Sequence, residues 1–339
     1  MTGVTGFVGG YLKRELLKEK ELKVVGLVRP ESAGRQLGLS EEGVEVVWGD
    51  VTLSNMGLEE SCGRELKKKV THIFHLAALY DTGADRERLV KENVIGTKNV
   101  LKFAHECKRL KKLVYVSTAY VAGKSLGKVK EGKLQKPALG FHNNYEESKF
   151  LAERAVREEM GELPVVIIRP SIVVGDSRSG YVNRVTGLIS ILRMAGWGRL
   201  VVVPGKMTAL LNMIPVDVLA QVLVVVMESK KCIGKSYHAT DPNPMVLGEG
   251  INMITKKRGL RKPVVLLAGV LAVVLGMPAM GNVLGRLRDV LEFLNKPVMF
   301  ETRNFKRDIL DCGLVFPSQK VYLTKLVDFV CSRVEERVI

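Results

Sequence analysis

Short apolar runs rich in β-branched residues alternate with amphipathic segments over roughly the first half of the chain. Strands are predicted at 22–28, 44–48, 72–77, 113–117 and 165–169, and helices at 9–19, 89–108 and 144–160. This alternation is typical of βαβ units and of a parallel sheet buried on both faces. The predicted fold class is therefore α/β, with a doubly wound parallel sheet.

Three glycines at three-residue spacing, Gly3, Gly6 and Gly9, precede the first predicted helix. Such glycines allow a tight turn and let backbone N–H groups approach a pyrophosphate at the helix N-terminus. Glycine triplets also occur in ordinary turns, so this spacing alone does not establish nucleotide binding.

Two strand ends strengthen the nucleotide interpretation. Arg29 follows the strand at 22–28, where an arginine can pair with the 2′-phosphate of NADP, and Asp50 follows the strand at 44–48 and can accept a hydrogen bond from an adenine amino group. The alternatives are a surface charge for Arg29 and a turn or helix cap for Asp50.

Tyr145 and Lys149 are spaced to lie one turn apart on one face of the helix predicted at 144–160. A neighbouring ammonium favours a phenolate, so we expect Lys149 to lower the pKa of Tyr145 and the phenol to serve as a proton donor to a carbonyl. The alternative is a tyrosine that stacks on a lysine stem. Thr118 favours the catalytic interpretation, because it ends the strand at 113–117 at the edge where open α/β sheets bind ligands.

The segments TGVTGFVG, GDV, HLAALYD, NVIGT, VYVSTAYVAG, YEESK and IIRPSIVVGD occur in the order found in extended short-chain dehydrogenase/reductases, which the whole chain resembles. Within that superfamily, HLAALYD, RPSIVVGDSRSG and NMIPVD resemble the male-sterility branch, which includes fatty acyl-CoA reductases and thioester reductase domains. The resemblance implies a Rossmann-type fold and a nicotinamide cofactor.

The resemblance also assigns roles to residues of this sequence. The catalytic set is predicted to comprise Thr118, Tyr145, Lys149 and the supporting Asn93. The cofactor-binding set is predicted to comprise Gly3, Thr5, Gly6, Phe7, Val8, Gly9, Arg29, Asp50, Val51, Ala77, Ala78, Tyr145, Lys149, Pro170 and Ser171. The substrate-binding set is predicted to comprise Tyr80, Thr118 and Ser171, and no metal site is expected.

The chain of 339 residues exceeds the usual size of a single core. We expect an NAD(P)-binding Rossmann domain over 1–170, to which 200–230 return, and a smaller substrate-binding lobe over 171–339. A nucleotide-binding turn needs a strand immediately before it, and the glycines begin at residue 3. We therefore expect that the first strand is missing because a start codon was assigned too late, and that an upstream extension improves stability and cofactor binding.

The formal net charge of +16 favours contact with anions, whether nucleic acid, anionic lipid, a phosphate-bearing cofactor or an acyl carrier. Basic residues are denser at 108–112, 124–136 and 256–262, which we interpret as solvated surfaces. The five cysteines form no CxxC pair, and the five histidines have no metal-ligand spacing. With no signal peptide at its start, the chain is expected in a reducing cytoplasm, with membrane association left open.

The longest apolar run, 263–277, is flanked by basic residues. As a helix it would extend about 22 Å, less than the ~30 Å of a bilayer core. We expect it to pack against the substrate pocket or to lie on a membrane surface, with peripheral contact through 256–285.

The leading functional hypothesis is an NADPH-dependent reduction of a carbonyl, such as an acyl thioester or an aldehyde, with NAD(H) as the less favoured cofactor. Two alternatives are an NAD-dependent nucleotide-sugar epimerase or dehydratase and a non-catalytic NADP-sensing or nucleic-acid-binding protein. The expected partner is a small-molecule or acyl-carrier substrate and not a specific nucleic acid. A homodimer is left open.

Overall fold

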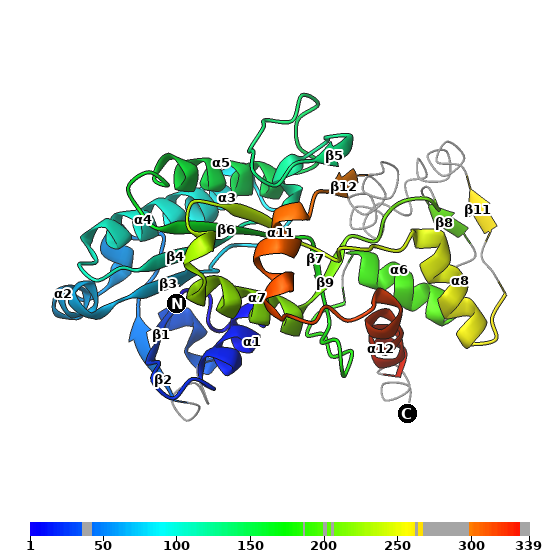
Figure 1. Ribbon diagram of the computed structural model, residues 1–339, viewed down its shortest axis with the longest axis horizontal. Helices are drawn as coiled ribbons and strands as arrows, with labels where there is room; N and C mark the ends of the chain where they lie inside the picture. The colour runs from blue at the N-terminus through cyan, green and yellow to red at the C-terminus, as the bar shows by residue number, and fades with distance from the viewer. Residues whose placement is uncertain are drawn as a thin grey trace.

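The main sheet is parallel and runs through the centre of the first 240 residues (Figure 1). The computed structural model describes residues 1–35, 43–185, 187–198, 202–204, 207–261, 264–266 and 298–332. Within them the sheet comprises β1 (Val24–Val28), β2 (Val44–Trp48), β3 (His72–His75), β4 (Lys112–Val116), β6 (Val165–Pro170) and β10 (Ser236–Ala239). The order of the last four is β10-β6-β4-β3, and β1 pairs with β2.

Met1 and Thr2 connect these two groups of strands. Thr2 forms parallel bridges to Leu27 in β1 and to His75 in β3, and its N–H donates to the carbonyl of Phe74 at 2.9 Å. The residues just before the glycine turn thus occupy the place between β1 and β3.

Helices cover both faces of the sheet, as the buried strands require. On one face lie α1 (Phe7–Leu16) and α7 (Val216–Glu228), and on the other α2 (Glu60–Lys69), α4 (Gly96–Glu106) and α5 (Asn144–Glu158) (Figure 1). Every residue of β6 is buried, as expected for a strand between two helical layers. Short elements at the sheet edges are η1 (Pro30–Arg35), η2 (Ser54–Gly57), α3 (Arg86–Leu89), η3 (Val90–Ile95), η4 (Ala119–Ala122) and η5 (Lys230–Cys232).

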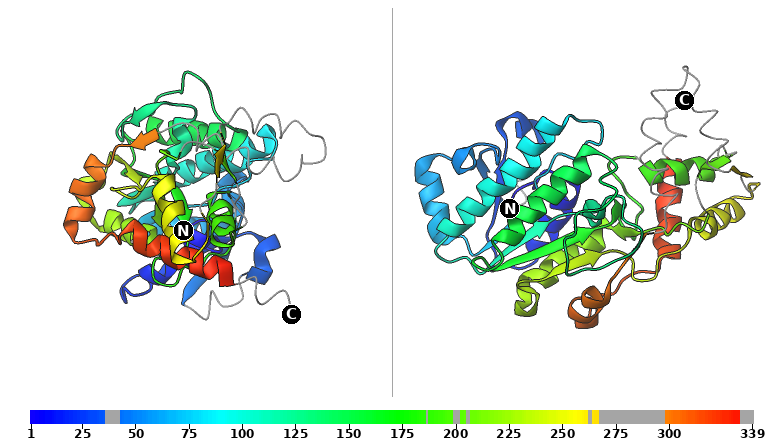
Figure 2. Two further views of the ribbon diagram at one scale, coloured as in Figure 1. Left: turned by 90° about the vertical axis from the view of Figure 1, so that its right-hand side faces the viewer. Right: turned by 90° about the horizontal axis from the view of Figure 1, so that it is seen from above.

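A second hydrophobic core lies in the later part of the chain, beyond the carboxyl edge of the sheet (Figures 1 and 2). It is built from α6 (Gly187–Gly196), α8 (Leu247–Lys257) and α12 (Gln319–Ser332). Three short parallel pairs lie outside the main sheet: β7 (Ile172–Val174) with β9 (Met213–Pro215), β8 (Val202–Pro204) with β11 (Val264–Leu266), and β5 (Gly127–Val129) with β12 (Val298–Phe300). The chain then passes through α11 (Arg303–Asp308), which packs on β10, and η7 (Leu310–Cys312).

Three sequence predictions differ from this structure. The helix predicted at 89–108 is a composite of α3, a π-helical turn at η3 and α4. The segment that returns to the main sheet comprises α7 and β10, whereas residues 202–204 pair with β11 instead, because the free edge of β6 is filled by β10. Of the apolar run predicted as a helix at 263–277, residues 264–266 form a strand and the rest lies outside the described residues.

All five cysteines are unpaired. Among the described residues, no helix combines the length and apolar character needed to cross a bilayer.

Candidate active site

The glycine turn fits closely against β3 and leaves the start of α1 open. Gly3 has a φ of 72°, and a Cβ there would lie 2.8 Å from the amide nitrogen of Ala77. A Cβ on Gly9 would lie 2.1 Å from the carbonyl oxygen of Gly3. Gly6 caps α1 without a side-chain hydrogen bond, so the first N–H groups of the helix, from Phe7 and Val8 onward, remain available for an anion.

A chain of buried hydrogen bonds runs from this turn toward α5. The Thr2 hydroxyl accepts from the N–H groups of Leu76 and Ala77 and lies 2.8 Å from His75 Nδ1. On the other side of the ring, His75 Nε2 lies 3.0 Å from Thr97 Oγ1.

The protonation of His75 follows from these partners. Thr97 donates its single hydroxyl hydrogen to the carbonyl of Asn93 at 2.6 Å, so His75 must donate from Nε2 and accept at Nδ1. Burial, together with the charge of Lys149, lowers the pKa of His75 to about 3. The neutral His75 ring therefore joins Thr2, just before the glycine turn, to Thr97, which in turn bonds Asn93 of η3.

Asn93 joins two loops of the site. Its side-chain oxygen accepts from the N–H of Leu79 at 2.8 Å, and its amide group donates to the carbonyl of Leu79 and to the hydroxyl of Ser148 at 2.9 Å. Since Ser148 lies on α5, Asn93 fixes the catalytic helix relative to the segment after β3. A supporting role for Asn93 in the active site stays a prediction, and these bonds show how it could act.

Thr118, Tyr145 and Lys149 are positioned by the carboxyl end of β4 and the first turns of α5. Thr118 follows β4 and donates to the carbonyl of Pro170 at 3.4 Å. Asn143 caps α5 by accepting the N–H of Glu146, which orients the first turn. The ring of Tyr145 meets that of exposed Tyr80 edge-on, with centroids 4.9 Å apart.

The Lys149 side chain is buried and extends to the carboxyl end of β4. Its ammonium donates to the carbonyl of Val116 at 2.9 Å and lies 4.7 Å from the centre of the Tyr115 ring. Burial lowers the pKa of Lys149 to about 8.

The expected lowering of the Tyr145 pKa by Lys149 is wrong for this structure. Burial raises the pKa of the Tyr145 phenol above its ordinary value, with smaller contributions from Tyr80 and Glu146. The reason is the orientation of Lys149, whose ammonium donates to the Val116 carbonyl. The phenol is therefore protonated, which is the state a proton donor requires.

Arg29 and Asp50 lie together at the ends of β1 and β2, with Arg29 Nη2 3.1 Å from Asp50 Oδ1. Arg29 also forms a bidentate ion pair with Glu92 of η3. Asp50 accepts the N–H of Thr52, the turn-cap contact that was the alternative interpretation of this residue. Asn99 fixes the next residue by donating to the carbonyl of Val51.

The segment after β6 closes the site. The Ser171 N–H donates to the carbonyl of Ala239, but its hydroxyl oxygen is buried and has no hydrogen-bond partner in the described part of the chain. Buried hydroxyls are nearly always satisfied, so this oxygen is suited to a ligand. Among the other predicted residues, Ala77 contacts Gly3 through its backbone, Ala78 is exposed, and Thr5 lies in the glycine turn.

Sequence reasoning did not single out His75, Thr97 or Ser148, although NVIGT and YEESK contain two of them. Beyond the end of α5, ligand atoms of Glu159, Glu162 and His105 of α4 lie within 4.8 Å of one another, a grouping that sequence reasoning did not predict. His105 Nε2 there lies 2.8 Å from a Glu159 oxygen.

The fold and this arrangement define a class: a Rossmann-type, extended short-chain dehydrogenase/reductase. Its glycine turn leads into the open N-terminus of α1, the arrangement that binds the pyrophosphate of a nicotinamide dinucleotide. More narrowly, the chain belongs to the male sterility protein family, whose model matches residues 1–223.

Individual relatives agree with this assignment. The chain is 25% identical over 305 residues to the fatty acyl-CoA reductase wat of Drosophila melanogaster, covering 76% of this chain and 58% of the relative. It is 33% identical over 258 residues to the L-2-aminoadipate reductase of Saccharomyces cerevisiae, covering 66% of this chain and 18% of the relative. The chain thus spans only part of the length of these curated relatives.

The structure is similar to that of the terminal R domain from the myxalamid PKS-NRPS biosynthetic pathway. The TM-score is 0.82 at 27% identity, and the match covers 100% of this chain and 90% of that one. A UDP-glucuronic acid 4-epimerase from Bacillus cereus in complex with NAD has the same fold, with a TM-score of 0.71 at 19% identity.

Proposed function

We propose that this protein reduces an acyl thioester, or the aldehyde derived from it, with a nicotinamide cofactor. The observation that carries the proposal is the position of Thr118 after the carboxyl end of β4 and of Tyr145 and Lys149 in the first turns of α5, which packs against the η4 turn that Thr118 caps. Relatives named as a fatty acyl-CoA reductase and an aminoadipate reductase support the substrate class.

When bound, the reduced cofactor supplies the hydride that adds to the carbonyl carbon. The Tyr145 phenol donates its proton to the carbonyl oxygen, and the Thr118 hydroxyl donates a hydrogen bond to the same atom. With a thioester the product is a hemithioacetal, which breaks its C–S bond to release an aldehyde and a thiol. In this structure the Lys149 ammonium donates to the Val116 carbonyl, and we propose that it turns to the phenolate once Tyr145 has given up its proton.

We propose further that NADPH is preferred over NADH through Arg29. The guanidinium lies at the end of β1 beside Asp50, the residue expected to contact adenine. A 2′-phosphate there would share Arg29 with Glu92, which already binds it in bidentate fashion. Glu92 is thus expected to moderate the preference.

Affinities of the wild-type protein and two variants for NADPH and NADH test this assignment. Arg29→Asp should reverse the preference, because a charge-assisted contact is worth about 1.5 to 3 kcal/mol. Glu92→Gln should increase the preference for NADPH, because it frees the guanidinium. Equal affinity of the wild-type protein for both cofactors would refute the role of Arg29.

The reaction class is tested by cofactor oxidation with a panel of thioesters, aldehydes, ketones and nucleotide sugars. We expect turnover with thioesters or aldehydes. Conversion of nucleotide sugars alone would refute the proposal and favour an epimerase or dehydratase. It is detected by chromatography of the products, because such enzymes regenerate their cofactor.

A further inference from the structure

A cavity of about 220 Å³ lies beside the proposed active site, under the loop that contains β5. It begins just past Thr118, because Val121 and Ala122 of η4 line it. Arg169 lines it as well, and the next residue, Pro170, accepts the Thr118 hydrogen bond. Figure 1 shows α5 and β5 on the face of the sheet opposite α1, so the cavity lies away from the glycine turn.

The cavity wall carries an excess of positive charge. Its described lining includes Lys128, Lys130, Lys133 and Arg169 but no carboxylate. Arg169 is neutralised by the buried Glu153, and Lys128 lies 3.5 Å from Glu301. Lys130 and Lys133 are exposed and form no ion pair within the described ranges. They are therefore free to bind an anion.

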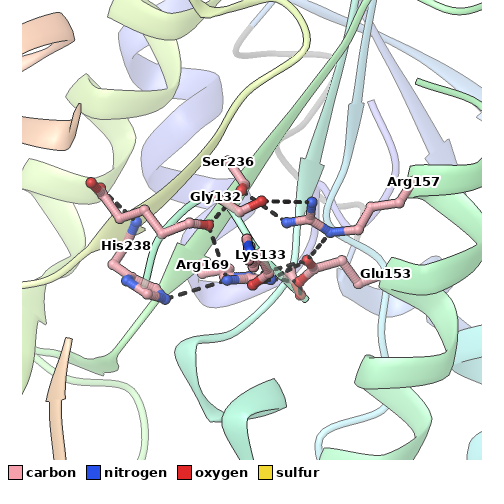
Figure 3. Close-up of polar contacts among 9 residues, drawn as sticks. Gly132, Lys133, Glu153, Arg157, Arg169, Ser236 and His238 are labelled. Atoms are coloured by element: carbon pink, nitrogen blue, oxygen red, sulfur yellow. Dashed lines mark hydrogen bonds and ion pairs between the residues drawn. The ribbon is translucent and has the colours of Figure 1, made fainter. Parts of the chain in front are cut away.

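Hydrogen bonds from two arginines hold the loop that carries these lysines (Figure 3). Arg169 donates to the carbonyls of Glu131 and Lys133, and Arg157 donates to that of Gly132. The carbonyls of three consecutive residues, 131–133, thus accept hydrogen bonds from Arg169 and Arg157. The guanidinium of Arg169 is fully used by these bonds, Glu153 and His238, so it shapes the cavity rather than binding a ligand.

The rest of the lining mixes apolar residues, such as Val121, Val129 and Leu134, with the polar Ser125 and Gln135. Such a wall beside two unpaired ammonium groups suits a ligand whose chain carries both apolar and amide groups and ends in a phosphate. A thioester substrate whose thiol arm is a phosphorylated pantetheine has this chemistry, both in coenzyme A and on a carrier protein.

We infer that this cavity binds the phosphate ester on the thiol arm of the substrate, with Lys130 and Lys133 as the binding groups. The inference rests on the proposed thioester reduction and deepens it. The acyl carbonyl would face Thr118 and Tyr145 while the thiol arm leaves past η4 toward β5. After the C–S bond breaks, the same lysines would hold the released thiol.

The test compares thioesters of one acyl group on three thiols: coenzyme A, 4′-phosphopantetheine and N-acetylcysteamine, which carries no phosphate. K130E/K133E should raise KM for both phosphorylated substrates by about tenfold, because it removes two screened ion contacts. The kcat values, and the KM for the N-acetylcysteamine thioester, should not change. The control K230E/K231E changes the net charge equally on exposed residues before β10, at the amino edge of the sheet, and should change neither KM.

The substrates also separate two sources of the phosphate. A KM increase for both phosphorylated thioesters locates the pantetheine phosphate in the cavity, whereas an increase for the coenzyme A thioester alone locates its nucleotide phosphates there. An equal change for all three thioesters, or no change, overturns the inference.

Calorimetric binding of free 4′-phosphopantetheine separates this inference from the proposed function. We expect K130E/K133E to weaken binding by about tenfold even if the protein reduces no thioester. Equal binding by the wild-type protein and this variant overturns the inference, whereas binding without any thioester turnover overturns only the proposed reaction.

Discussion

At the scale of single residues, the burial of Tyr145 determines its role. Burial keeps the phenol protonated, so the residue is suited to donate a proton and not to attack. We predict that Tyr145→Phe lowers turnover by roughly 10² to 10⁴, the usual contribution of a positioned general acid. Cofactor affinity and thermal stability should remain near wild type. A Phe variant that keeps full turnover would exclude Tyr145 as the acid.

Lys149 gives a prediction for the dependence of activity on pH. The ammonium must be charged to stabilise the phenolate, and burial lowers its pKa to about 8. The value of kcat/KM for reduction should therefore be constant below about pH 8 and fall at higher pH. In Lys149→Arg the guanidinium stays charged, so any remaining activity should lose this fall. A wild-type profile that is flat up to pH 10 would contradict the assignment.

The sequence predicted the positions of the proposed catalytic residues on β4 and α5, but not the partners that set their electrostatics. The helical spacing of Tyr145 and Lys149 and the strand-end position of Thr118 are local features. By contrast, Lys149 donates to a carbonyl on β4, and Arg29 pairs with Glu92, which is 63 residues away. Such partners depend on tertiary packing, which no local pattern encodes.

At the scale of elements, the close approach of α1 to the glycine turn gives a matched pair of variants. Gly9→Ala places a Cβ 2.1 Å from the Gly3 carbonyl oxygen, so α1 must move away from the turn, whereas a Cβ on Gly10 meets no atom within 4 Å. We predict that Gly9→Ala abolishes measurable cofactor binding and that Gly10→Ala leaves it unchanged. Similar cofactor affinities of the two variants by fluorescence titration would refute this account of the turn.

The predicted strands agree closely with β1, β2, β3, β4 and β6, because buried parallel strands have continuous apolar runs. The π-helical turn at η3 could not be predicted in this way. It depends on the Asn93 bonds to Leu79 and Ser148, which join three separate segments.

At the scale of the whole molecule, Glu153 connects α5, β6 and the loop that carries β5. Although burial opposes its ionisation, Arg169 and Arg157 hold the pKa of Glu153 below its ordinary value. Its contribution to stability is therefore present above the unfolded-state pKa and is lost as the pH falls toward the lower folded-state pKa.

Removing this carboxylate should leave Arg169, which is only 1% exposed, as an uncompensated buried charge. We predict that Glu153→Ala lowers the free energy of unfolding by about 3 to 5 kcal/mol. Glu158→Ala removes an exposed pair with Arg154 on the same helix and should cost less than about 1 kcal/mol. Denaturant unfolding of both variants measures the difference, and equal losses would contradict the structural role of Glu153.

The organisation of the later chain was only partly predictable. The sequence predicted that 200–230 return to the main sheet, whereas α7 packs on that sheet and the strand that joins it, β10, lies just beyond this range. It did not identify β10, because the four residues Ser236–Ala239 are fully buried yet include a serine, a tyrosine and a histidine. Their polar groups are satisfied by distant partners such as Glu131 and Asp308.

The central claim is that hydride passes from the cofactor to a substrate carbonyl held at Tyr145 and Thr118. The most direct measurement uses NADPH labelled with deuterium at the transferred position, an acyl thioester, and mass spectrometry of the aldehyde and alcohol products. The account predicts deuterium on the former carbonyl carbon, release of one thiol per thioester reduced, and loss of both signals in Tyr145→Phe. Thiol release without deuterium transfer would show hydrolysis instead of reduction and would contradict the account.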